Sequence, residues 1–166
     1  VSRGLGDVYK RQAIYLEDKK VKCTDHHQHI GFLIKCIDKT IVNEINKELE
    51  KYDITAVQQE ILVYLYFSKN QGPVYQKDIE HYLRLSNPTV AGIVKRLESK
   101  KMINRFPAKE DGRFKCLVLT EKGEEVVLET LSIVPNKIEG YLTKGLDQEE
   151  RKELVTLLNK VLKSIK

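Results

Sequence analysis

The sequence is poor in several residue types on which disulfide-rich and cofactor-dependent proteins rely. Its 166 residues include no tryptophan, one methionine, three cysteines and four histidines. The cysteines, Cys23, Cys36 and Cys116, are far apart and form no C-x-x-C pair. An odd number of dispersed cysteines argues against a disulfide framework, so we interpret them as reduced and mostly buried thiols.

Motifs for membrane insertion, export and catalysis are also absent. No apolar run approaches the roughly 18 to 20 residues of a membrane span, and no cleavable signal is visible at the start; we therefore expect a cytoplasmic protein. Residues 1–12 lack any helical or strand period and begin with Val, so residues 1–25 are interpreted as a flexible or non-native leader. Without a phosphate-binding loop, nucleophile elbow or H-E-x-x-H motif, we predict neither an enzyme nor a cofactor or metal.

What the sequence does contain is a concentration of positive charge. Between Ser86 and Cys116 there are eight Lys or Arg residues and three acidic residues, a net charge of +5 that equals the net charge of the whole chain. A basic segment in a nearly neutral background is typical of a protein that binds a polyanion. A solvated lysine-rich surface is the alternative.

Helical patterns flank this segment. Apolar residues recur with a period near 3.6 between Phe32 and Leu49, which predicts a long helix over residues 26–52. Thr55 and Gln58 fit a capping box that opens a second helix reaching Phe67. Thr120 caps a helix to about Ile133, which Pro135 interrupts or kinks. Asp147 with Glu150 caps a last helix, whose apolar stripe has no evident partner in the chain; the stripe comprises Leu154, Leu157, Leu158, Val161, Leu162 and Ile165.

The basic segment itself has the pattern of a winged helix. A short helix over residues 76–83 and a tight connection precede Ser86, an N-cap followed by Pro88 in the first turn of a helix reaching Lys100. Two strand candidates, residues 103–106 and 114–119, follow with an Asp-Gly turn between them. We therefore predict a mainly α fold with a small β-wing, in which residues 55–119 form a winged helix-turn-helix.

The helix that begins after Ser86 is the predicted recognition element. Its apolar side chains lie on one side of the helical wheel and its small, polar and basic ones on the other, with Gly92 among the latter. Asn87 and Thr89 in the first turn can reach base edges or a phosphate, and Lys95 and Arg96 suit phosphates or a guanine edge. The DNA-binding candidates on this helix are Ser86, Asn87, Pro88, Thr89, Gly92, Lys95 and Arg96.

The tip of the hairpin is the second candidate. Arg113 follows the Asp-Gly turn and has Lys109 and Lys115 as basic neighbours, which suits the narrow, electronegative minor groove. Asp111 could pair with Arg113 and orient its guanidinium group. An exposed ion pair without function is the alternative.

Four segments together resemble the MarR family of bacterial regulators: LRLSNPTV at 83–90, VKRLE at 94–98, DGR at 111–113 and LVLTEKG at 117–123. The resemblance implies a single domain over residues 26–166 that binds a pseudo-palindromic DNA operator as a homodimer. It assigns residues 26–52 and 121–166 to dimerisation, Arg113 to the minor groove and Asp111 to bracing it. It also implies that a ligand, metal or oxidant relieves binding. In the turn before Ser86 the family commonly has Gly or Asn, and this sequence has Arg84. Because a positive φ would strain an arginine, the conformation of this turn is expected to differ slightly from that of the family.

Several residues are candidates for sensing the ligand, oxidant or metal that would control DNA binding. By the resemblance, a small aromatic or amphipathic effector is expected between the dimer helices and the DNA-binding core, where Phe32, Tyr64 and Phe67 are candidate lining residues. Gly31 occupies the position of the reactive cysteine in peroxide-sensing relatives, and Cys36 faces the apolar side, which favours a buried, inert thiol. Cys23, His26, His27 and His29 have donor types suited to zinc, although their spacing is not that of a structural zinc site.

Two alternatives remain from the sequence alone. One is a metal- or redox-responsive regulator of the same fold. The other is a winged-helix module for protein–protein contacts, in which the third helix has usually lost its basic outer face. The basic segment favours DNA as the partner, and the expected role is that of a repressor.

Overall fold

The computed structural model describes residues 29–107 and 115–165. The chain divides into two compact units, residues 1–41 and 42–166. The helix α2 (Ile30–Leu49) begins in the first unit and ends in the second, where the 3-10 turn η2 (Glu50–Tyr52) continues it. The expected helix start near His26 is too early, because His29 precedes the helix and its carbonyl accepts the first amide bonds, from Phe32 and Leu33.

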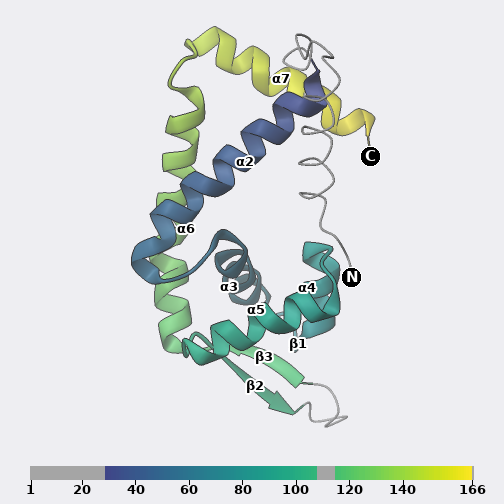
Figure 1. Ribbon diagram of the computed structural model, residues 1–166, viewed down its shortest axis with the longest axis vertical. Helices are drawn as coiled ribbons and strands as arrows, with labels where there is room; N and C mark the ends of the chain where they lie inside the picture. The colour runs from purple at the N-terminus through teal and green to yellow at the C-terminus, as the bar shows by residue number, and fades with distance from the viewer. Residues whose placement is uncertain (1–28, 108–114, 166) are drawn as a thin grey trace, which may run out of the picture. The chain divides into compact units, whose positions relative to one another are not determined.

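The second unit contains the predicted winged helix (Figure 1). Its element order is α3 (Ala56–Ser68), β1 (Val74–Tyr75), α4 (Gln76–Leu83), α5 (Asn87–Ser99), β2 (Ile103–Pro107), β3 (Lys115–Leu119), α6 (Glu121–Thr143) and α7 (Gln148–Ser164). The sheet has the antiparallel order β1-β3-β2. The strand β1 was not predicted, since two residues are too few to show a period; Val74 pairs with Leu117 on β3.

Side-chain caps define three of the helix starts. Thr55 and Gln58 form the predicted capping box of α3, with the Thr55 amide donating to Gln58 Oε1 at 3.1 Å. Asp147 accepts from the amides of Glu149 and Glu150 at the start of α7. Thr120 accepts from the amide of Gly123 at the start of α6. These contacts satisfy amides that a helix N-terminus otherwise leaves unpaired, which is why the predicted starts are confirmed.

The core of the second unit lies between α3, α4, α5, the sheet and α6. Ile61 and Leu62 of α3, Ile79 of α4 and Leu97 of α5 are completely buried. Truncating one such side chain to alanine typically costs about 2–5 kcal/mol. This core therefore fixes the orientation of α5, whose opposite face remains exposed.

The root of the hairpin is joined to α6 by a compact set of hydrogen bonds. The Thr120 amide donates to the Met102 carbonyl at 3.0 Å, and its hydroxyl donates to the Lys101 carbonyl at 2.7 Å. A Cβ on Gly123 would lie 2.2 Å from the Met102 carbonyl oxygen. The L-x-L-T-x-x-G pattern thus has a packing explanation: Thr120 bridges the two segments, and only glycine allows α6 to approach so closely.

Two other expectations require correction. Helix α6 continues through Pro135 to Thr143, so the proline does not interrupt it; the ring removes one amide donor, but the remaining helix bonds continue on both sides. Cys36 is exposed rather than buried, and Cys116 is only partly buried. The apolar stripe that contains Cys36 leaves Phe32, Leu33 and Ile37 40–48% exposed, which explains why this thiol is accessible.

Candidate nucleic-acid interface

Helix α5 has two chemically distinct faces. Val90, Ile93, Val94 and Leu97 are at most 8% exposed and face the core, as predicted. On the other side Ser86, Asn87, Pro88, Thr89, Lys95 and Arg96 are all exposed. The helix therefore presents its polar and basic residues together on one solvent-facing surface, which we call the α5 outer face.

The first turn of α5 is open to a ligand. Ser86 is the N-cap residue, as predicted, but its hydroxyl lies 2.8 Å from the Thr89 hydroxyl and caps no backbone amide. Pro88 has no amide to satisfy. The amides of this turn thus keep the partial positive charge of a helix N-terminus, which attracts phosphate oxygens.

The turn before Ser86 retains the left-handed conformation. Arg84 has φ 52° and ψ 39° and ends α4, with its amide bonded to the carbonyls of Glu80 and His81. The expectation that Arg84 would change the conformation of this turn is therefore wrong. Burial of α4 and α5 on either side holds the arginine in a conformation that costs a non-glycine residue on the order of 1 kcal/mol or more.

Further along α5, the basic side chains are not neutralised. Lys95 and Arg96 form no ion pair with any described residue. The Arg96 Nε donates to the Gly92 carbonyl at 3.1 Å, which directs the guanidinium group along the helix surface. Gly92 itself is sterically open, because an added Cβ would meet only Arg96 Nη2, at 3.8 Å.

Two other members of the basic segment are paired. Arg105 forms a hydrogen-bonded ion pair with Glu98, and Lys100 lies 3.2 Å from an Asp53 carboxylate oxygen. The hydrogen bond that Arg105 donates to the Glu98 carboxylate lowers the pKa of Glu98 and raises the pKa of Arg105. These pairs connect α5 to β2 and to the turn before α3. They therefore stabilise the fold, and they add little to the positive charge that the surface presents to a ligand.

The hairpin contributes one described candidate, Lys115, which is exposed at the start of β3. Its positive charge contributes to the lowered pKa of Glu98. Lys109, Asp111 and Arg113 lie outside the described residues, so their predicted roles at the hairpin tip stay predictions.

Sequence reasoning missed one functional candidate, Glu80 on α4. Its Oε1 accepts from Asn87 Nδ2 at 2.7 Å and from Gln76 Nε2 at 3.0 Å. The contact joins two helices across the turn, and no periodic pattern signals a side-chain pair seven residues apart.

The comparisons with known proteins agree with this geometry. The MarR family model matches residues 54–115. The HTH-type transcriptional regulator MgrA of Staphylococcus aureus is 34% identical over 117 residues, which cover 70% of this chain and 76% of MgrA. The HTH-type transcriptional regulator YwoH of Bacillus subtilis is 30% identical over 125 residues, 75% of this chain and 88% of YwoH. The chain belongs to the MarR family.

Solved structures show the same fold in MarR-family proteins. The S. aureus MepR–DNA complex has a TM-score of 0.69 and 32% identity, covering 82% of this chain and 98% of MepR. The reduced form of E. coli MarR has a TM-score of 0.72 and 26% identity, covering 81% and 96%. The predicted winged helix-turn-helix is thus confirmed. This MarR-family protein is a helix-turn-helix transcriptional regulator, and members of the family are not enzymes.

The ring contacts of the predicted effector-binding residues Tyr64 and Phe67 are made with other aromatic residues and not with each other. The rings of Tyr64 and Tyr82 lie 4.5 Å apart between centroids with their planes tilted by 37°, and Phe67 meets Tyr66 edge-on at 5.4 Å. Phe67 is 58% exposed, and Phe32 belongs to the first unit. Their role in binding an effector stays a prediction.

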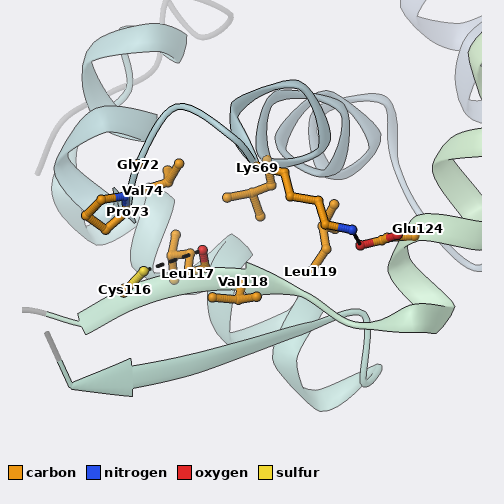
Figure 2. Close-up of a pocket in the computed structure, with 10 residues that line it drawn as sticks. Lys69, Gly72, Pro73, Val74, Cys116, Leu117, Val118, Leu119 and Glu124 are labelled. Carbon is orange, nitrogen blue, oxygen red and sulfur yellow. Dashed lines mark hydrogen bonds and ion pairs between the residues drawn. The ribbon is translucent and has the colours of Figure 1, made fainter. Parts of the chain in front are cut away.

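A small cavity does lie beside the sheet. It has a volume of about 140 Å³ and extends from the loop before β1 along β3 to the start of α6. Figure 2 shows the Lys69–Glu124 ion pair at one end of it and Cys116 at the other. Its remaining lining is largely the apolar side chains Leu65, Val74, Leu117, Val118 and Leu119.

Residues 29–107 and 115–165 contain no group of three His, Cys, Asp or Glu side chains arranged to hold a metal ion. Cys23, His26 and His27 lie outside these ranges. No helix within the same ranges has the length and apolar character that crossing a membrane requires.

Proposed function

We propose that this protein is a homodimeric repressor that binds a pseudo-palindromic DNA operator and releases it when a small aromatic or amphipathic effector binds. The observation that carries the proposal is the α5 outer face. It combines open first-turn amides with Lys95 and Arg96, which form no ion pair with a described residue, on a helix whose inner face is buried. This arrangement suits a helix that enters the major groove with its N-terminal residues first.

The similarity to MepR, solved as a DNA complex, supports duplex DNA as the partner. The predicted wing residues Lys109, Asp111 and Arg113 complete the proposal, with Arg113 in the adjacent minor groove. A helix in the major groove with an arginine in the minor groove reads two surfaces of one half-site. A dimer then reads two half-sites related by its own symmetry.

Exposed apolar side chains on α7 support the homodimer. Leu154, Leu157, Leu158 and Leu162 are 42–53% exposed, and no residue of α7 is buried. A stripe of this kind on a capped helix exceeds the scattered apolar residues of an ordinary surface. A second copy of the same helix offers a self-complementary surface to cover it.

Fluorescence anisotropy with duplexes selected from a randomised library tests DNA binding. We expect selective binding that weakens steeply with salt, because Lys95 and Arg96 would release counterions from phosphates. Lys95→Gln and Arg96→Gln should each reduce the salt slope by about 1 if the side chain contacts a phosphate. Lys160→Gln, which removes an exposed charge from α7, is the matched control. Salt-insensitive binding, or none, would instead favour a protein partner.

Exposed aromatic side chains support the effector part of the proposal. Phe32 and Phe67 are 40% and 58% exposed, and aromatic rings are preferred in pockets for small amphipathic ligands. An aromatic acid such as benzoate should raise the melting temperature and lower the affinity for DNA, since a ligand stabilises the state it binds. Phe67→Ala should reduce both effects; an unchanged response would remove Phe67 from the site.

A further inference from the structure

Glu80 places a carboxylate beside the basic surface of α5. It is half-buried on α4, and its Oε1 accepts hydrogen bonds from Asn87 in the first turn of α5 and from Gln76 one turn earlier on α4. A carboxylate at a surface that binds DNA repels the phosphates. The negative charge of Glu80 therefore weakens the attraction between this surface and DNA. The hydrogen bonds that Glu80 accepts indicate a role other than attraction.

The chemistry of the contact fixes how Asn87 is oriented. An ionised carboxylate only accepts hydrogen bonds, so the Asn87 amide must direct its NH2 group toward Glu80. One N–H of Asn87 is then used, and its second N–H and its Oδ1 remain available to a ligand. Gln76 Nε2 donates to the same carboxylate oxygen at 3.0 Å and helps to hold it in place.

The free donor and acceptor of Asn87 match one base. Adenine presents the N7 acceptor and the N6 donor side by side in the major groove, and asparagine recognises this edge with two parallel hydrogen bonds. We propose that Glu80 is a positioning residue that holds Asn87 in the orientation for reading an A·T base pair, a role that rests on the proposed DNA binding. Glu80 thereby lowers the affinity for DNA in general and increases the selectivity at one base pair.

A matched pair of variants separates these two effects. Glu80→Gln keeps an oxygen acceptor in place and loses the charge, whereas Glu80→Met loses both with little change in size. Both variants should bind a non-specific duplex more tightly than the wild type, and to a similar extent, because both lose the same negative charge. Only Glu80→Met should lose selectivity, and only at the base pair that Asn87 reads. A purely electrostatic role would affect both variants alike, and a purely structural role would reduce selectivity at every base pair.

The experiment begins with the full chain and a duplex selected from a randomised library, in which each base pair is then substituted in turn. Asn87→Ala identifies the base pair that Asn87 reads: we expect the wild type to prefer A·T there by about fivefold to 150-fold and the variant to show little preference. Glu80→Met should show the same loss at the same base pair and normal selectivity elsewhere. Glu80→Gln should retain the preference.

The results separate the positioning role of Glu80 from the reading of a base pair by Asn87. Retained selectivity in Glu80→Met, or a uniform loss at every base pair, would overturn the positioning role. An unchanged base preference in Asn87→Ala would overturn the reading by Asn87. If the wild type binds no duplex, the proposed function fails first and this inference fails with it. Thermal unfolding of each variant confirms that any loss arises in a folded protein.

Discussion

Substitution of Gly92 by alanine is the sharpest test of where DNA contacts this protein, because it should increase the stability of the fold and decrease the affinity for DNA. Gly92 is an interior residue of α5, where glycine is less favourable than alanine by about 0.8–1.0 kcal/mol. The added Cβ of Gly92→Ala would meet only the mobile end of Arg96, at 3.8 Å. The variant should therefore be more stable by nearly the full difference in helix propensity.

A gain of that size should raise the melting temperature by about 2–4 °C in a protein of this length. Binding to DNA should respond in the other direction. If the surface of the duplex approaches Gly92 closely, the new methyl group must push it away, and overpacking of a tight contact costs about 1–3 kcal/mol. The dissociation constant for the selected duplex should then rise by roughly fivefold to 150-fold.

Gly140 offers a matched control. It is an exposed residue of α6, and an added Cβ there would meet nothing within 4 Å. Gly140→Ala should stabilise the helix without weakening the affinity for DNA. If Gly92→Ala raises the melting temperature and still binds the selected duplex as tightly as the wild type does, the α5 outer face does not lie against DNA at this residue.

Gly123, Glu98 and Leu158 provide tests of other contacts. Gly123→Ala should lower the free energy of unfolding in urea by about 1–3 kcal/mol, because its Cβ would overlap the Met102 carbonyl oxygen; a stability equal to that of the wild type would contradict the close approach. The hydrogen bond from Arg105 lowers the pKa of Glu98, so the pair stabilises the fold above the ordinary carboxyl pKa of 4.5 and this contribution is lost as the pH falls through the lowered folded-state value. Glu98→Gln should accordingly lose less stability than the wild type in an acid titration followed by circular dichroism. Leu158→Lys should shift the sedimenting species from dimer to monomer at micromolar concentration, since it places a charge in the apolar stripe of α7; an unchanged dimer would locate the interface elsewhere.

Much of the fold could be predicted because local chemistry and tertiary packing agree. Thr55 with Gln58 and Asp147 with Glu150 mark helix starts whose caps appear in the structure. The apolar spacing of α5 correctly identified the residues that face the core. Such signals depend on neighbours within one turn of helix, which a sequence displays directly.

The misses have a common physical origin in contacts between distant segments. Strand β1 exists because Val74 and Tyr75 pair with β3, and two residues show no period of their own. The contact of Asn87 with Glu80 crosses a turn between helices. Cys36 was expected to be buried because it lies on an apolar stripe, but periodicity identifies a face without saying what covers it.

Thr120 has a mechanical consequence for any signal that reaches the DNA-binding surface. Its amide and hydroxyl hold the carbonyls of Met102 and Lys101, and it also starts α6 by capping Gly123. Thr120 is the one residue between the last strand of the hairpin, β3, and the first turn of α6, so no flexible linker separates them. A change in the direction of α6 would therefore act directly, through the Thr120 hydrogen bonds, on the segment that leads into β2.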